Sequence, residues 1–302
     1  MIPEFPQFKG LELSDKADVE KVTQKYPPYS DFNFISMWCW DIKGDMKISM
    51  LNGNLVVRFT DYINGKPFFS FLGDNMVNET VETLLEFSKK EGLEAKLRLI
   101  PEVSVAGLDD IRFVIEEDSA HFDYIYDIEK LKLFDNSEFK IKRNEISKFL
   151  RDSGDVKIQA LDILDPNIKS DIVNLNLDWL ENKKRRDPFF DIRNELTAID
   201  RFLNMNLANF HTVGIFSNNE LVAYSINEIC KNNFAIGHFY KVKKYNGVFS
   251  YLMKKSASFL SDFNIKSINF EQDLGIEGLR RSKKSYKPID FLKKYIISER
   301  VS

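Results

Sequence analysis

The sequence has little cysteine, histidine, glycine or proline, and these shortages exclude several classes of protein. Its two cysteines, Cys39 and Cys230, cannot build a disulfide framework or a thiolate zinc site. Its three histidines, His121, His211 and His238, lie far apart and show no metal-ligand spacing. We therefore expect no metal site. With 13 Gly and 9 Pro in 302 residues, a collagen-like or linker-rich chain is also excluded.

Long apolar runs are missing as well. No segment approaches the roughly 18 consecutive apolar residues that a membrane-spanning helix needs. The first residues, from Met1 to Pro6, lack the basic region and apolar run of a signal peptide. With so few cysteines, this pattern predicts a cytoplasmic protein with no integral membrane segment.

What is present is the composition of a folded protein. Hydrophobic residues make up 43% of the chain, charged residues 29%, and there are 26 Phe, enough for a large core. The length predicts about two domains. Residues 1–135 hold 15 basic and 25 acidic residues, a net −10, whereas residues 136–302 hold 28 and 21, a net +7. A polyanionic ligand would therefore prefer the second half.

The order of expected elements occurs twice. Each half reads as a strand, two helices, three meandering strands, a helix, a strand, a helix and a strand. Asn52-Gly53 and Asn64-Gly65 are hairpin signals in the first half. This order is similar to that of the GNAT acyltransferase fold. We therefore predict an α/β (α+β) protein with two tandem GNAT-like domains, 1–135 and 136–302, each a mixed, mainly antiparallel sheet flanked by helices.

A basic loop joins an expected strand, 234–242, to an expected helix, 245–263. Amide groups at a helix start are unpaired and attract anions, and a glycine lets a phosphate approach the backbone. GNAT enzymes hold the pyrophosphate of coenzyme A at this turn, but Phe249 stands here where a small residue is usual. An ordinary turn with a solvated basic loop is the alternative. The candidate donor-binding residues are Lys241, Lys243, Lys244, Asn246 and Gly247.

A second cluster follows the expected strand 265–271. If that strand continues to Asp273, Glu271 and Asp273 point the same way and could accept a proton. Tyr286 could protonate the leaving group or bind the acceptor. Arg280, Lys283 and Lys284 could bind an anionic substrate. The alternative is a salt-bridged turn in which Glu271 and Asp273 pair with Arg280 and Lys283.

This second cluster resembles the C-terminal signature of the phosphatidylglycerol lysyltransferase C-terminal family, which is also carried as a domain of unknown function. Phe270 replaces the usual Arg, and Tyr240 stands in His238–Val242 where members often carry Glu. Ser30-Asp31-Phe32 and Lys142-Arg143-Asn144 also resemble family segments. The matching signature residues are Asn269, Glu271–Gly275, Gly278–Arg280, Lys283, Ser285-Tyr286 and Pro288.

The resemblance implies a tandem GNAT fold and an acyltransferase. The family is similar to aminoacyl-phosphatidylglycerol synthases and Fem-type peptidyltransferases, which move an aminoacyl group from aminoacyl-tRNA to an amine or a lipid hydroxyl. It therefore implies aminoacyl-tRNA, ahead of acyl-CoA, as donor substrate, no tightly bound cofactor, and a small-molecule, peptide or lipid head-group acceptor. The competing hypothesis is a non-catalytic binding or regulatory module that kept the fold.

Overall fold

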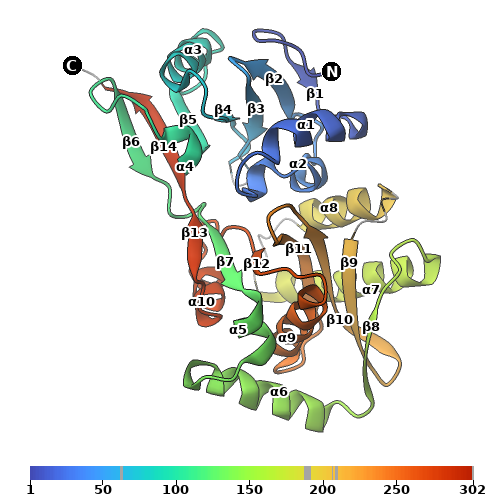
Figure 1. Cartoon of the computed structure of the whole chain (residues 1–302). Coiled ribbons are helices and arrows are strands. Elements are labelled where there is room, and N and C mark those ends of the chain that lie inside the picture. Colours follow the sequence, from blue (N-terminus) through green and yellow to red (C-terminus); the bar gives the residue numbers. More distant parts are fainter. Residues whose placement is uncertain (62–63, 187–191, 206, 208–209, 301–302) are drawn as a thin grey trace. The chain divides into compact units, whose positions relative to one another are not determined.

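The computed structural model describes residues 1–61, 64–186, 192–205, 207 and 210–300 (Figure 1). The chain forms two compact units, and each is discontinuous in sequence. The first unit consists of Met1–Tyr124, Gln272–Arg281 and Phe291–Ser302, and the second of Ile125–Glu271 and Ser282–Asp290. This division differs from the predicted single boundary at 135/136.

In the first unit, the described residues form a seven-stranded sheet in the order β1-β2-β3-β4-β5-β14-β6. Neighbouring strands are antiparallel except β4 and β5, which run parallel. The strands are β1 (Lys9–Gly10), β2 (Lys47–Leu51), β3 (Asn54–Thr60), β4 (Pro67–Leu72), β5 (Lys96–Pro101), β6 (Phe113–Glu117) and β14 (Lys294–Glu299).

The second sheet has the order β13-β7-β12-β11-β10-β9-β8 among the described residues. From β7 to β8 the neighbours are antiparallel except β11 and β12, which are parallel. The strands are β7 (Asp123–Asp127), β8 (Val156–Ala160), β9 (Phe210–Ser217), β10 (Glu220–Ile229), β11 (Phe234–Val242), β12 (Ser267–Asn269) and β13 (Asp290–Leu292).

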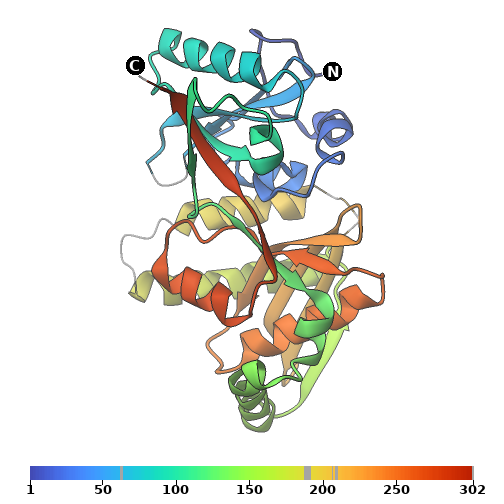
Figure 2. The same ribbon diagram turned by 60° about the vertical axis from the view of Figure 1, so that its left-hand side comes forward.

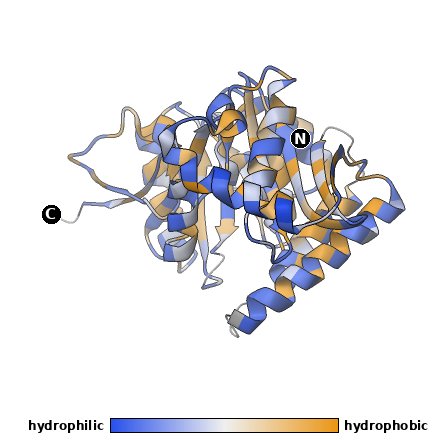
Figure 3. Cartoon of the chain, turned by 90° about the horizontal axis from the view of Figure 1, so that it is seen from below, coloured by the Kyte–Doolittle hydropathy of each residue, from blue (hydrophilic) through white to orange (hydrophobic). Residues whose placement is uncertain are grey.

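Helices of mixed polarity accompany both sheets, and apolar and hydrophilic residues are interleaved along them (Figure 3). Side-chain caps explain two helix starts: Asn33 accepts from the Ser36 amide at α2, and Asp127 from the Lys130 amide at α5. The helices are α1 (Lys16–Thr23), α2 (Phe34–Trp40), α3 (Val77–Lys90), α4 (Glu102–Val105), α5 (Ile128–Leu133), α6 (Lys140–Asp152), α7 (Pro166–Arg186), α8 (Ile192–Asn204), α9 (Val248–Ser261) and α10 (Glu277–Ser285).

The core of the first unit forms where α3 covers the sheet. Val77, Val81, Leu84 and Leu85 recur at helical spacing and are buried. They pack with apolar residues of the strands, including Val56, Phe69, Phe71, Leu97, Ile100 and Ile297.

The predicted repeat of element order is confirmed. Among the described residues, the corresponding strands of the two sheets form the parallel pairs: β4 with β5 in the first sheet, and β11 with β12 in the second. However, the two halves of the chain exchange strands. β14, from the C-terminal end, lies between β5 and β6, and β7, from the N-terminal half, lies beside β12 (Figures 1 and 2). From the sequence, residues 291–298 are expected to form one final strand, but this is wrong: the segment holds parts of two strands, of which β13 joins the second sheet and β14 joins the first.

Two other expected elements have different bounds. The predicted strand 265–271 is only Ser267–Asn269. The predicted helix 245–263 begins later, at Val248, because Gly247 is its N-cap. The sequence also predicts a strand over 55–62 and a helix over 194–206, and the last residue of each, Tyr62 and Asn206, lies outside the described residues.

Candidate functional site

The candidate site lies where the two parallel strands of the second unit stop pairing. The last paired residues are Ile236 on β11 and Asn269 on β12, yet β11 continues to Val242. Just past that point β11 bulges: Asn227 of β10 pairs with Gly237, whereas Ile226 pairs with Phe239. His238 is therefore the extra residue, and such bulges re-aim side chains at sites.

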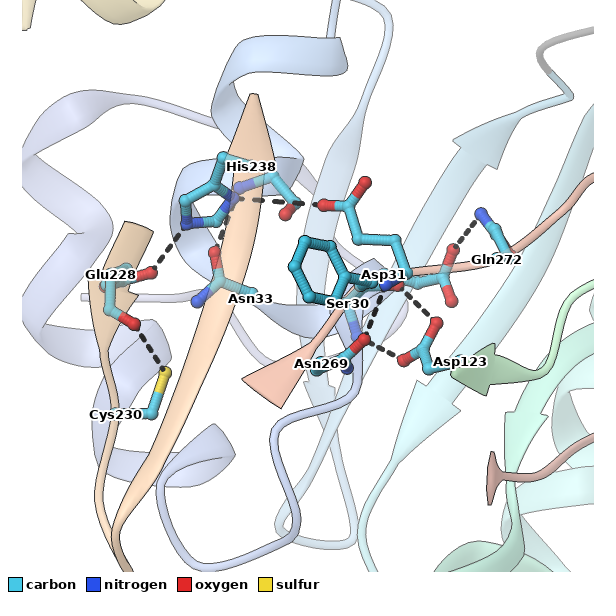
Figure 4. Close-up of polar contacts among 12 residues, drawn as sticks. Ser30, Asp31, Asn33, Asp123, Glu228, Cys230, His238, Asn269 and Gln272 are labelled. Carbon is cyan, nitrogen blue, oxygen red and sulfur yellow. Dashed lines mark hydrogen bonds and ion pairs between the residues drawn. The ribbon is translucent and has the colours of Figure 1, made fainter. Parts of the chain in front are cut away.

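His238 is held by two carboxylates of the same unit. Its Nε2 lies 3.0 Å from Glu228 Oε2, and its Nδ1 lies 3.8 Å from Glu271 Oε1. Figure 4 shows Glu228 and His238 facing one another. Burial disfavours the imidazolium, but hydrogen bonds and attraction from Glu228 and Glu271 outweigh it and raise the pKa of His238 to about 9. At neutral pH the cluster holds a cation between two acids.

Glu271 sits at the open end of this arrangement. Its side chain is 24% exposed, compared with 3% for His238. Its backbone is left-handed, with φ of 56°, an unusual conformation for a residue other than glycine. The Asn269 side chain accepts a 2.6 Å hydrogen bond from the Glu271 amide, and thereby supports the turn. Backbone strain of this kind concentrates at functional sites.

Asp273 occupies a different environment, in the first unit. The strand β12 ends at Asn269 and does not continue to Asp273, so the condition under which Glu271 and Asp273 would point the same way is not met. The Asp273 side chain is buried and accepts four hydrogen bonds: from Tyr124 at 2.6 Å, from Arg280 at 2.8 and 3.0 Å, and from the Gly275 amide at 2.8 Å. Although burial raises its pKa, Arg280, Tyr124 and Gly275 lower it more. This geometry favours the structural alternative for Asp273.

Tyr286 is also enclosed. Its hydroxyl lies 3.0 Å from the Ser250 hydroxyl, and Lys142 lies 4.4 Å above its ring. The residue is 4% exposed, and burial raises its pKa well above the ordinary value. A buried phenol that resists deprotonation and has its partners on α9 and α6 is placed to pack against these two helices, rather than to meet an acceptor.

The basic loop after β11 is largely neutralised by the protein itself. Lys241 lies 2.7 Å from Glu195 and above the Trp179 ring, and Lys243 is ion-paired with Asp178 and Glu220. Lys244 and Asn246 are exposed.

Gly247 has a structural reason to be glycine. Its φ is 87°, and a Cβ there would stand 2.0 Å from the Glu145 carbonyl oxygen. The Glu145 carboxylate accepts a 2.8 Å hydrogen bond from Ser250 in the first turn of α9. A carboxylate of α6 thus already lies at this helix start.

The three bases of α10 that the sequence predicts to bind an anionic substrate have different surroundings. Arg280 binds Asp273, and Lys283 donates to the backbone carbonyl of Phe270. Lys284 is exposed. Lys283 therefore contacts main-chain oxygens instead of the carboxylate that the structural alternative predicts. No sequence pattern predicts such a contact between a side chain and distant backbone.

Two charged groups of the structure were missed by sequence reasoning. Glu228 was missed because its place beside His238 depends on the bulge. In the first unit, Lys294 of β14 is fully buried, lies 2.7 Å from Asp123 and is ion-paired with Asp31. Ser30 donates to Asp123 at 2.7 Å, and Figure 4 shows Ser30, Asp31 and Asp123 together. The buried ion pairs anchor β14 to the N-terminal half.

No group of three or more potential metal ligands occurs in the part of the chain that the structure describes. Within the same residues, every helix is too short or too polar to cross a bilayer.

Comparison with known proteins gives a family match and several similar structures. The family described as "Phosphatidylglycerol lysyltransferase, C-terminal" matches residues 23–298. No curated protein sequence matches. A conserved protein of unknown function from Bacteroides thetaiotaomicron is 24% identical, with a TM-score of 0.83, covering 99% of this chain and all of that chain.

Two more distant structures share the fold. The C-terminal domain (DUF2156) of an Agrobacterium fabrum protein described as a lysylphosphatidylglycerol synthetase is 13% identical, with a TM-score of 0.66, covering 96% of this chain and 92% of that one. L-PGS from Bacillus licheniformis is 13% identical, with a TM-score of 0.61, covering 99% and 93%. The predicted fold class, two tandem GNAT-like domains with mixed sheets, is confirmed.

Proposed function

Because the chain belongs to the phosphatidylglycerol lysyltransferase C-terminal family, we propose that it transfers an aminoacyl group from aminoacyl-tRNA to an amine or hydroxyl acceptor. A lipid head group, a peptide or a small molecule could supply that acceptor. The observation that carries the proposal is Glu271, a partly exposed carboxylate at the open end of the β11–β12 pair, paired with the buried His238.

The chemistry assigns the proton to Glu271. The acceptor oxygen or nitrogen attacks the carbonyl carbon of the donor ester, and Glu271 takes the acceptor's proton. A new C–O or C–N bond forms, the ester bond to the tRNA ribose breaks, and the ribose oxygen leaves with that proton. A positioned general base of this kind contributes roughly 100- to 10,000-fold in rate.

His238 has a supporting part in this scheme. Its pKa of about 9 keeps it protonated at neutral pH, so it is already an imidazolium when the acceptor binds. A protonated imidazole cannot accept the acceptor's proton. It instead orients the Glu271 carboxylate, while Glu228 holds the other ring nitrogen.

The surroundings of α9 favour aminoacyl-tRNA over acyl-CoA as donor. A coenzyme A pyrophosphate at the start of α9 would meet the Glu145 carboxylate. Lys241 and Lys243, which would have to neutralise it, are engaged by acids of the protein. A tRNA can instead use exposed bases through its phosphates, among them Lys184, Arg185, Arg281 and Lys284.

One observation favours the non-catalytic module as a second candidate. Tyr240 stands where family members often carry Glu, and its hydroxyl donates a 2.5 Å hydrogen bond to Asn227. If the Glu of other members takes part in the reaction, Tyr240 cannot perform that step in this chain. A binding module would still hold aminoacyl-tRNA, without transfer.

The test is a transfer assay with individually charged, radiolabelled aminoacyl-tRNAs. The acceptors are phosphatidylglycerol vesicles and a panel of small amines. We expect transfer by the wild type and a fall of about 100-fold or more in Glu271→Gln with unchanged thermal unfolding. Glu277→Gln is the matched control, because Glu277 is an exposed acid of α10.

Two results would count against the proposal. Full transfer by folded Glu271→Gln removes Glu271 as the base. Binding of aminoacyl-tRNA by the wild type without transfer to any acceptor supports the non-catalytic module instead.

A further inference from the structure

The conformation of Glu271 has to be imposed on it. Residues with a Cβ avoid the left-handed region, and Glu gains nothing locally from adopting it, unlike Asn. With φ of 56°, Glu271 directs its carboxylate to within 3.8 Å of His238 Nδ1. In an extended conformation, a residue following β12 would place its side chain elsewhere.

Two side chains of the second unit hold the backbone at this turn. Asn269, fully buried at the end of β12, accepts from the Glu271 amide at 2.6 Å. Lys283 of α10 donates from Nζ to the Phe270 carbonyl and lies 3.5 Å from the Glu271 carbonyl. The amide and the two carbonyls that flank Glu271 are therefore all contacted by side chains.

Lys283 is itself fixed in place. Its carbonyl accepts a 2.9 Å hydrogen bond from the Tyr126 hydroxyl. The Tyr126 ring, almost fully buried on β7, packs edge-to-face on Phe270 at 5.3 Å. Tyr126 thus supports both Lys283 and the residue whose carbonyl Lys283 binds.

We propose that Lys283 is a positioning residue, which binds the carbonyls of Phe270 and Glu271 and so holds the Glu271 carboxylate against His238. It acts through Glu271, and its importance for transfer rests on the proposed function. This assignment replaces the predicted role of Lys283 in binding an anionic substrate, because its ammonium group is directed at main-chain oxygens inside the fold.

The test reads the Glu271–His238 contact directly and needs no substrate. The chain has three histidines, so the imidazole signals can be assigned by NMR and titrated. Glu228 on β10 and Glu271 both face His238, and Glu271→Gln removes the second of these carboxylates. We expect it to lower the His238 pKa by about half a unit or more.

If Lys283 positions Glu271, Lys283→Met should lower the His238 pKa by a similar amount, and the double variant should lower it no further. Lys283→Arg, which keeps a charged donor, should restore the wild-type titration. Lys287→Met is the matched control, since Lys287 is an exposed lysine just beyond the same helix. It should leave the titration unchanged.

Folded Lys283→Met with a wild-type His238 titration would overturn the proposal. If Lys283→Met does not fold, Lys283→Gln replaces it, because the glutamine amide can still donate to one carbonyl. A partial lowering of the His238 pKa is then expected, and an unchanged pKa would overturn the proposal. Since the readout is a pKa, it remains decisive whether or not the protein transfers aminoacyl groups.

Discussion

At the scale of single residues, two acids that stand two positions apart have opposite surroundings. Asp273 has hydrogen-bond donors on both oxygens, whereas Glu271 is partly exposed and faces an imidazolium. An acceptor that must lose a proton can reach the second kind of carboxylate and not the first. The difference makes separate predictions for Asp273 and for the His238 cluster.

Asp273→Asn should damage the fold more than the chemistry. The amide cannot accept from Arg280, Tyr124 and Gly275 together, so one or more donors lose their partner. We expect the thermal midpoint to fall by about 5 °C or more. Transfer per folded molecule, measured at a temperature where the variant is fully folded, should stay within a few-fold of the wild type. A stable variant with transfer reduced 100-fold would instead assign Asp273 to the chemistry.

The His238 cluster predicts a pH dependence of stability. The folded pKa of His238, about 9, lies above its ordinary value of 6.5, so the folded state favours the protonated form. The stabilisation is complete below pH 6.5 and is lost as the pH rises through 9. The wild type should therefore lose unfolding free energy between pH 6 and pH 9.5. Glu228→Gln removes one partner of the imidazolium, so the loss in this variant should be smaller than in the wild type by about 1–2 kcal/mol.

Urea denaturation at the two pH values measures this change. The control is Glu220→Gln, an exposed acid of β10 that pairs with Lys243. It should keep the wild-type difference between the two pH values. An identical pH dependence in Glu228→Gln and the wild type would contradict the assignment of Glu228 as a partner of the imidazolium.

At the scale of elements, the start of α9 shows how a motif position can serve packing. A glycine at a strand-to-helix turn suggests phosphate binding, but here the missing side chain lets α9 approach the backbone of α6. The protein's own Glu145 carboxylate accepts a hydrogen bond from Ser250 in the first turn of α9. The element is therefore built for helix–helix contact.

Gly247→Ala should consequently destabilise the protein whether or not a donor is present. The new Cβ would lie 2.0 Å from the Glu145 carbonyl oxygen at a φ of 87°, so the backbone must shift. We expect a loss of about 2–4 kcal/mol in unfolding free energy. Gly278→Ala is the control, because nothing lies within 4 Å of its Cβ position on α10, and a gain of about 0.5–1 kcal/mol is expected.

Thermal and urea unfolding compare the two variants. If Gly247→Ala kept wild-type stability and lost only donor affinity, the phosphate-binding interpretation would be preferred.

At the scale of the whole molecule, the exchange of strands makes the two halves depend on each other. Each sheet needs a strand from the other half beside its parallel pair: β14 for the first and β7 for the second. Removing β14 would also take away Lys294 and leave Asp31 and Asp123 buried without their cation.

We therefore expect that neither residues 1–135 nor residues 136–302 fold alone. Each fragment should show poor amide dispersion and no cooperative thermal transition. Mixing the fragments during refolding should restore both, because β7 and β14 can then be exchanged between chains. A fragment of residues 136–302 that unfolds cooperatively on its own would contradict this expectation.

Much of the fold follows from local sequence. The hairpin signal Asn52-Gly53 lies between β2 and β3, with φ of 54° and 79°, as its left-handed preference predicts. The amphipathic pattern of residues 78–91 predicts a helix, and α3 forms there, over Val77–Lys90. Repetition of these local patterns was enough to predict two domains of one type.

The sequence by itself determined the element types, their repetition and the density of charge after residue 269. Only the tertiary structure decided that β7 and β14 are exchanged, that Asp273 belongs to Arg280, and that His238 lies between Glu228 and Glu271. The physical reason is range: turns and amphipathic faces depend on neighbouring residues, whereas strand exchange, a bulge that shifts register and the partner of a buried charge depend on contacts between distant parts of the chain.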